Sequence, residues 1–133
     1  MIVCDASAFV DNLVGDAETG GAARRRLLDV RQLAVPSVFP AEVTSALRSL
    51  EARGDITSAR ADRASRSLHS TRAVRYAFGP LADRVWELRH NVTVYDAWYV
   101  ALAERMDLVL VTADDRLASA PGAHCAIEVV AGG

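Results

Sequence analysis

Residues 108–118 read LVLVTADDRLA, and this stretch decides the expected fold. Its first five residues, 108–112, form an unbroken run of leucine and β-branched side chains. Strands without polar alternation are typical of a parallel sheet that is covered on both faces. The run is followed by two aspartates, Asp114 and Asp115. We therefore expect a buried parallel strand with acidic residues just beyond its carboxyl end.

The rest of the chain alternates short apolar runs with segments of helical periodicity. The apolar runs predict further strands at 1–4, 33–35, 73–78 and 126–130. The periodic segments predict helices up to Gly15, at 18–30, 40–53, 57–69 and 81–89, and from Asp96 to Met106. This alternation predicts an α/β fold. We expect a three-layer α/β/α domain with a mostly parallel, about five-stranded sheet flanked by helices.

Length and composition limit the class of protein. A chain of 133 residues is expected to form one domain over 1–133. Hydrophobic residues make up 51% and charged residues 24%, which argues against intrinsic disorder. No apolar run approaches the roughly 20 residues of a membrane helix. The N-terminus does not resemble a secretory signal, so we expect a cytoplasmic protein.

The cysteines and histidines do not indicate a zinc site. Cys4 and Cys125 are too few for a disulfide scaffold, and the three histidines are widely spaced. Cys4 is expected to be a buried thiol. The aromatic residues Trp86, Trp98 and Tyr99 are expected in the core, and an exposed stacking platform is the alternative.

Carboxylates follow the predicted strands or begin the helices after them. They are Asp5, Glu42, Asp96 and Asp114. Each one alone is explained as a helix cap or first-turn residue, which the helix dipole favours. In an open parallel sheet, however, ligands bind beyond the carboxyl ends of the strands. If these acids converge there, their repulsion raises their pKa values or requires a cation between them. Oxygen ligands alone favour Mg²⁺ or Mn²⁺, which can activate water and hold phosphate oxygens.

Four segments of the sequence, taken in their order and spacing, are more informative about the class of protein than any one segment alone. They are IVCDASAFV at 2–10, VPSVFPAEVTSALRSL at 35–50, VTVYDAWYVALAERM at 92–106, and LVLVTADDRLA at 108–118. Together they span nearly the whole chain. In this arrangement the chain resembles the PIN-domain ribonucleases, specifically the VapC-like toxins of bacterial toxin–antitoxin pairs.

The resemblance implies a metal-dependent endoribonuclease that acts as a toxin. In this family, acids at matching positions share a site that binds one or two divalent cations and cleaves RNA. The implied catalytic residues are Asp5, Glu42, Asp96 and Asp114. Of these, Asp5, Asp96 and Asp114 are the expected ligands of Mg²⁺ or Mn²⁺.

The resemblance also implies supporting residues and partners. The Thr112 hydroxyl is expected near the site, and Ser7 is expected to play a similar supporting role. Asp115 is expected to be a solvated neighbour or an outer group of the site. The implied partners are an RNA substrate, a small antitoxin protein whose tail covers the acidic site, and a second copy of the chain in a homodimer.

Two alternatives stay open. One is a nuclease-inactive PIN-fold module that only binds a partner, which the presence of all four acids disfavours. The other is a different Mg²⁺-dependent phosphotransfer domain. An aspartyl phosphatase would need a second acid where Ser7 stands, and a phospho-acceptor receiver would need a lysine, which the chain lacks.

Any RNA-binding surface must be local, because the net charge is −2. Arginines are consecutive at 24–26, and Arg60, Arg63 and Arg66 recur every third residue in the predicted helix 57–69. A solvated helix face is the simpler interpretation. Contact with RNA phosphates, which positions a strand without specifying sequence, is the alternative.

Overall fold

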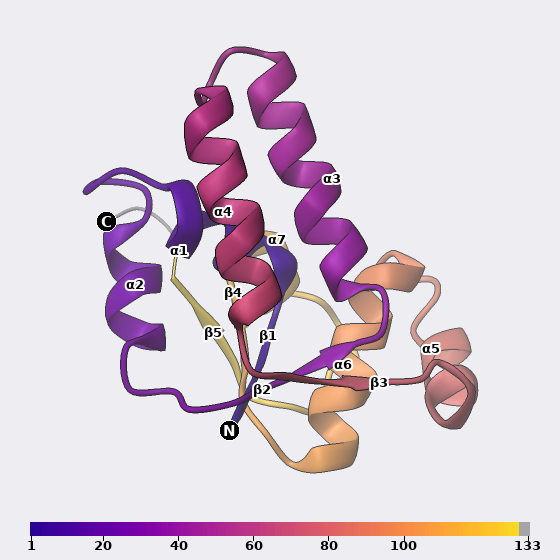
Figure 1. Ribbon diagram of the computed structural model, residues 1–133. Helices are drawn as coiled ribbons and strands as arrows, with labels where there is room; N and C mark the ends of the chain where they lie inside the picture. The colour runs from indigo at the N-terminus through magenta and orange to yellow at the C-terminus, as the bar shows by residue number, and fades with distance from the viewer. Residues whose placement is uncertain (131–133) are drawn as a thin grey trace.

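A five-stranded parallel sheet forms the centre of the computed structural model, which describes residues 1–130 (Figure 1). The strands are β1 (Ile2–Cys4), β2 (Leu33–Pro36), β3 (Ala73–Tyr76), β4 (Leu110–Thr112) and β5 (Ile127–Val129). They lie in the order β3-β2-β1-β4-β5, and every neighbouring pair is parallel. The predicted α/β fold is therefore confirmed. The last three residues of the predicted domain, 131–133, lie outside the described residues.

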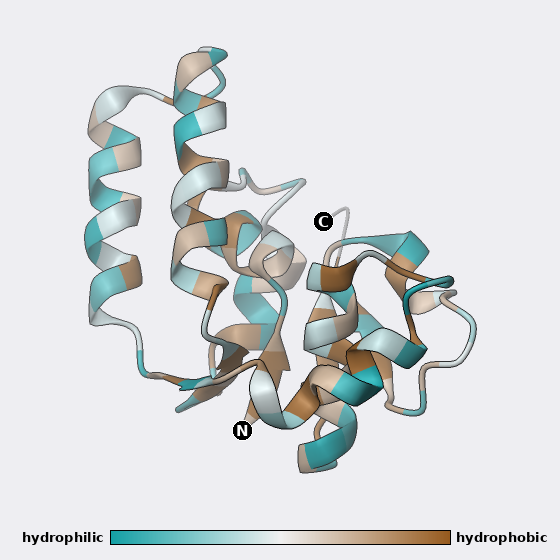
Figure 2. Ribbon diagram, turned by 90° about the vertical axis from the view of Figure 1, so that its right-hand side faces the viewer, coloured by the Kyte–Doolittle hydropathy of each residue, from teal (hydrophilic) through white to brown (hydrophobic). Residues whose placement is uncertain are grey.

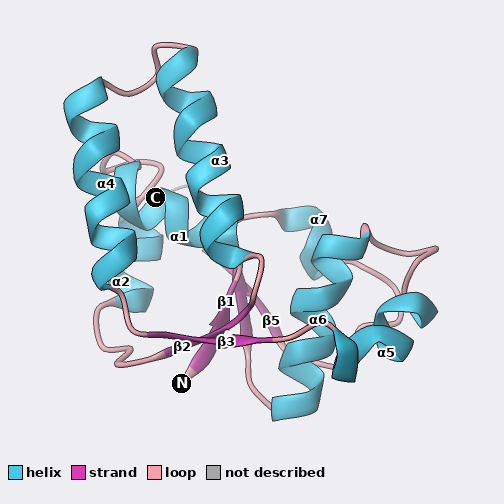
Figure 3. Cartoon of the chain, turned by 45° about the vertical axis from the view of Figure 1, so that its right-hand side comes forward, coloured by secondary structure: helices cyan, strands magenta, loops and turns pink. Residues whose placement is uncertain are grey.

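Helices cover both faces of this sheet. They are α1 (Ala6–Val14), α2 (Gly21–Leu27), α3 (Phe39–Ala52), α4 (Ser58–Ser70), α5 (Ala82–Glu87), α6 (Val94–Met106) and α7 (Asp115–Ala118), with a 3₁₀ turn at Gly79–Leu81. Helix α1 packs against α2, α3 and α4, whereas α6 packs on β1, β2 and β4. Figure 3 shows the sheet between these two groups, and α3 and α4 extend beyond it as a pair. None of the helices within residues 1–130 combines the length and apolarity needed to cross a bilayer.

The core follows from the apolar strands. Every residue of β1, β2 and β4 is buried. Figure 2, which is coloured by hydropathy, shows hydrophobic ribbon in brown through the middle of the molecule. Helix α6 is buried over seven consecutive residues, 97–103, because it lies against the sheet under α5. Cys4, Trp98 and Tyr99 are buried as predicted. The prediction for Trp86 is wrong, because its side chain is 64% exposed.

Helix α6 begins two residues earlier than predicted. The Thr93 side chain caps it by accepting a hydrogen bond from the Asp96 backbone N–H at 3.2 Å. Asp96 therefore lies in the first turn and not at the cap.

Two other helices differ from the prediction. Helix α2 is shorter than 18–30, because Asp16 accepts hydrogen bonds from the backbone of Glu18 and Thr19 and holds a turn there. Helix α7 was not predicted. It has only one turn, and the Asp114 side chain caps it by accepting from the Arg116 backbone N–H at 2.9 Å.

Candidate active site

The carboxyl ends of β1 and β4 lie side by side at the centre of the sheet. The chain leaves β1 toward β2 on one side, and β4 occupies the other side, so a crevice forms where the strand order reverses. Asp5 directly follows β1 and Asp114 follows β4, while the first turns of α3 and α6 supply Glu42 and Asp96. All four side chains line one hollow of about 490 Å³. The structure thus brings the predicted acids together.

Asp5 is held by two hydroxyl groups. Its Oδ2 accepts hydrogen bonds from Ser7 Oγ and from Thr112 Oγ1, both at 2.8 Å. Ser7 Oγ in turn accepts a hydrogen bond from the backbone N–H of Ala113 at 3.1 Å. Thr112 Oγ1 accepts one from the backbone N–H of Asp114, also at 3.1 Å. Each hydroxyl proton is therefore directed at the carboxylate. This network joins the ends of β1 and β4 and stabilises a negative charge on a side chain that is only 7% exposed.

Burial and mutual repulsion raise the pKa of three of the acids. Burial raises the pKa of Asp5, against the opposing hydrogen bonds from Ser7 and Thr112. Burial also raises the pKa of Asp96, and the negative charge of Asp5 adds to the shift. The pKa of Glu42 is raised by burial and by the charges of Asp5 and Asp96. Acids that influence one another in this way form one electrostatic site.

Glu42 is oriented by a buried tyrosine. The Tyr99 hydroxyl donates to Glu42 Oε1 at 2.7 Å, and the tyrosine ring is fully buried. Tyr99 lies one turn after Asp96 on α6, so the same face of that helix presents one acid and supports another. We expected Tyr99 only as a core residue, and its polar role is a finding of the structure.

Asp114 differs from the other acids because an arginine side chain contacts its carboxylate. Arg116 Nε lies 3.3 Å from Asp114 Oδ1, and Arg116 Nη2 lies 3.5 Å from Oδ2. The hydrogen bond from the Arg116 side chain lowers the pKa of Asp114. The Arg116 side chain is itself 92% exposed.

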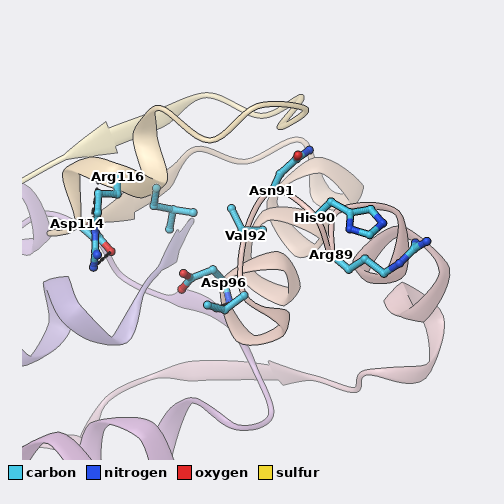
Figure 4. A pocket seen from close by; sticks show the side chains of 9 residues that line it. Arg89, His90, Asn91, Val92, Asp96, Asp114 and Arg116 are labelled. Carbon is cyan, nitrogen blue, oxygen red and sulfur yellow. Dashed lines mark hydrogen bonds and ion pairs between the residues drawn. The ribbon is translucent and has the colours of Figure 1, made fainter.

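A second hollow of about 530 Å³ adjoins the acids (Figure 4). Asp96 and Asp114 line both hollows. The remaining walls of the second hollow come from residues 89–93 at the entrance to α6 and from Arg116 and Leu117 of α7. The acids therefore lie at the junction of two hollows.

The donor set is chemically suited to a hard divalent cation. It consists of carboxylate oxygens, the ligands that Mg²⁺ and Mn²⁺ prefer. Within residues 1–130, however, no three histidine, cysteine, aspartate or glutamate side chains lie close enough together to hold one ion as they stand. Asp96 and Asp114, unlike Asp5, are only partly buried.

Several other residues lie outside or at the edge of the site. Asp115 is exposed in α7 and lines neither hollow. The side chains of Arg60, Arg63 and Arg66 lie on α4, which also lines neither hollow. Asp11, which our sequence analysis did not select, lines the first hollow with the four acids. Its signal was weak, because a mid-helix aspartate two turns after a cap resembles an ordinary surface residue.

The fold and the site define a class: α/β domains with an acidic crevice at the carboxyl edge of a parallel sheet. A family model described as the PIN domain matches residues 2–123. The chain belongs to the PIN-domain family.

Similar proteins match almost the whole chain. Ribonuclease VapC9 of Mycobacterium tuberculosis is 40% identical over 130 residues, which are 98% of each protein. Ribonuclease VapC1 of the same organism is 42% identical over 129 residues, 96% of each. Among solved structures, the M. tuberculosis toxin VapC20, which cleaves the sarcin–ricin loop, aligns with a TM-score of 0.66 and 19% identity. That alignment covers 90% of this chain and 94% of VapC20, and it bears on the fold alone.

Proposed function

We propose that this chain is a metal-dependent endoribonuclease and the toxin of a toxin–antitoxin pair, which hydrolyses RNA phosphodiester bonds at the acidic crevice. One observation carries the proposal: Asp5, Glu42, Asp96 and Asp114 line a single hollow at the sheet edge. The identity of about 40% to VapC ribonucleases over nearly the full chain supports the choice of RNA as substrate.

A divalent cation is part of the proposal. PIN-domain ribonucleases of the VapC type are generally dependent on one. Asp5, Asp96 and Asp114 would hold it, and their oxygen ligands favour Mg²⁺ or Mn²⁺. Such an ion, when bound, lowers the pKa of water and offsets negative charge on the phosphate that is attacked.

The surrounding residues have separate tasks. Ser7 and Thr112 favour the ionised form of Asp5 and so oppose the effect of its burial, since both donate to its Oδ2. Tyr99 holds Glu42 at the wall of the hollow. Asp96 is an expected metal ligand, so Glu42 is the carboxylate better suited to accept the proton of the attacking water, since burial and the charges of its acidic neighbours raise its pKa.

The proposed partners follow from the same class. VapC toxins pair with antitoxins, and we expect a small antitoxin protein that covers the crevice. A homodimer is also expected. An RNA substrate makes the cytoplasm the expected place of action.

A non-cleaving PIN-fold module is the main alternative, and the test separates the two. Purified chain, freed of any antitoxin, is incubated with total RNA and with Mg²⁺ or Mn²⁺. We expect discrete fragments that EDTA abolishes. Intact RNA beside a folded chain that binds Mn²⁺ would favour the non-cleaving module. Fragments that persist in EDTA would contradict metal-dependent cleavage.

A further inference from the structure

Trp86 is exposed three residues before the segment 89–93 that lines the second hollow, and such exposure is unusual for this residue type. Its side chain is 64% exposed in α5. The guanidinium carbon of Arg89 lies 4.2 Å from the centre of the indole ring, and Arg89 Nη1 donates to the Trp86 carbonyl at 2.7 Å. A cation–π contact and a hydrogen bond therefore fix Arg89 over the ring, and Trp86 as a whole still remains exposed.

The Trp86–Arg89 pair is continuous with the acids. Arg89 lines the second hollow together with His90, Asn91 and Arg116. Figure 4 shows these side chains in a row that runs from Asp114 and Arg116, past Asp96, to Arg89. We call Trp86, Arg89, His90, Asn91 and Arg116 the Trp86 ledge. It extends outward from the side of the crevice formed by α6 and α7.

Charge explains why an RNA-cleaving site would need such a surface. An RNA phosphate approaching several carboxylates is repelled unless cations lie beside its path. Arg116 and Arg89 stand at the two ends of the row. Arg116 is 92% exposed and its contacts with Asp114 are long, at 3.3 and 3.5 Å. Its guanidinium is thus able to exchange the carboxylate for a phosphate, which arginine binds well.

We propose that the Trp86 ledge binds a single-stranded segment of the RNA beside the cleaved bond, with a base stacked on Trp86 and phosphates on Arg89 and Arg116. Exposed aromatic rings stack unpaired bases of any sequence, and neighbouring arginines hold the backbone. A paired strand would not expose its base faces in this way. The inference rests on the proposed function, because it assigns the RNA path to that same site.

The test is RNA binding measured without cleavage. A fluorescently labelled single-stranded oligoribonucleotide of about 12 nucleotides is titrated by anisotropy in an Asp96→Asn background at several salt concentrations. Trp86→Ala should weaken binding about tenfold without changing its salt dependence. Trp86→Phe should retain most of the affinity. Arg89→Gln and Arg116→Gln should each lower the slope of log affinity against log salt by about 0.7, the value for one phosphate contact on a single strand.

A matched control comes from the opposite edge of the sheet. Arg31 is exposed just before β2, at the amino end of the strands, and Arg31→Gln should leave both affinity and slope unchanged. Wild-type affinity and slope in the Trp86 and Arg116 variants would overturn the inference. So would a change in oligomeric mass of Trp86→Ala, measured by light scattering, with no change in RNA affinity, because Trp86 would then serve a protein interface.

The inference and the proposed function fail separately. If the chain with all four acids cleaves RNA and the ledge variants bind RNA normally, the RNA-binding role of the Trp86 ledge is wrong and the proposed nuclease activity is correct. If that chain cleaves no RNA while the ledge variants lose affinity as described, the Trp86 ledge does bind RNA and the proposed nuclease activity is wrong.

Discussion

Asp5 is a buried carboxyl group, and two hydroxyl groups favour its ionised form. Ser7 and Thr112 both donate to Asp5 Oδ2 at 2.8 Å, and each is itself fixed by a backbone N–H. Without such donors, a carboxyl group at this depth would take up a proton more readily, since burial already raises its pKa. The hydroxyls therefore set the pH range in which Asp5 can bind a cation.

Thr112→Val tests this role with little change in shape. Loss of one hydrogen bond to the anion should raise the pKa of Asp5 further, so the acid limb of the pH–rate profile should move to higher pH. Cleavage at neutral pH should fall about 10- to 100-fold. Thr112→Ser, which keeps the hydroxyl, should stay close to wild type. A loss of equal size at every pH would indicate a packing defect instead.

The residues of the site differ in how far the sequence could predict them. Asp5 directly follows an apolar strand and Asp114 follows another after one residue, so their place at the sheet edge could be inferred from spacing. Tyr99 could not be assigned a polar role, because a tyrosine in an apolar helix stripe is indistinguishable from core. Its bond to Glu42 joins residues 57 positions apart, and no local pattern encodes such a contact.

At the scale of elements, α5, α6 and the loop before β5 are joined by one arginine. Arg84 forms two hydrogen bonds with Glu104 of α6, at 2.7 and 3.0 Å, and also donates to the Gly122 carbonyl. Glu104 accepts the His124 backbone N–H as well. This cluster therefore fixes α5, which carries Trp86, relative to α6, which carries Asp96.

Arg84→Met should therefore destabilise the fold. Only 13% of the Glu104 side chain is exposed, so its charge would remain in a poorly hydrated place, at a cost of about 2–3 kcal/mol. Chemical denaturation measures this loss. The control is Arg53→Met, which removes an exposed ion pair with Asp55 and should cost less than about 1 kcal/mol. Equal losses of stability in the two variants would show that the contacts of Arg84 do not stabilise the packing of α5 on α6.

The arginines of α4 give a second prediction at this scale. Replacing Arg60, Arg63 and Arg66 with alanine should weaken RNA binding and lower its salt slope by about 2, for three phosphate contacts. The rate of cleavage at saturating RNA should not change, because α4 lines neither hollow of the site. An unchanged salt slope would identify the triplet as an ordinary solvated face.

Element boundaries were less predictable than the elements. The strands and the long helices followed from apolar periodicity. The start of α6 depended on the Thr93 cap, and the apolar stripe gave no sign of it. Helix α7 has one turn, which is shorter than any periodic signal. The extent of α2 was set by a turn at residues 16–19 whose hydrogen bonds are local but polar.

At the scale of the whole molecule, strand order creates the crevice. The order β3-β2-β1-β4-β5 places β1 beside β4, and this pairing joins Asp5 to a motif more than 100 residues away. Periodicity predicted an α/β sheet but left its strand order open. The convergence of the acids was therefore a hypothesis until the topology was known.

The clustered acids of the crevice should lower the free energy of unfolding at neutral pH. Asp5, Glu42 and Asp96 have raised pKa values in the folded state, so their contribution to stability is greatest below the ordinary carboxyl range and is lost as pH rises through the raised values. Asp96→Asn should then stabilise the chain at neutral pH by on the order of 1 kcal/mol, a modest value because water screens a partly buried group. That corresponds to a rise in Tm of about 4 °C.

Thermal unfolding at neutral pH and near pH 4 measures this effect. The rise in Tm caused by Asp96→Asn should shrink toward zero at the lower pH. Mn²⁺ should raise the Tm of the chain with Asp96 more than that of Asp96→Asn, because an ion that binds only the folded state stabilises it. Asp62→Asn, an exposed change on α4, is the control and should respond as wild type. A destabilised Asp96→Asn would contradict the proposed repulsion among the acids.

The most direct measurement is cleavage of one defined RNA by wild type, Asp96→Asn and Asp62→Asn, each with Mn²⁺ and with EDTA. The acidic crevice predicts that wild type and Asp62→Asn cleave only with the metal ion, and that Asp96→Asn is slower by about a hundredfold or more. Cleavage that survives both EDTA and Asp96→Asn would contradict the assignment of this crevice as the active site.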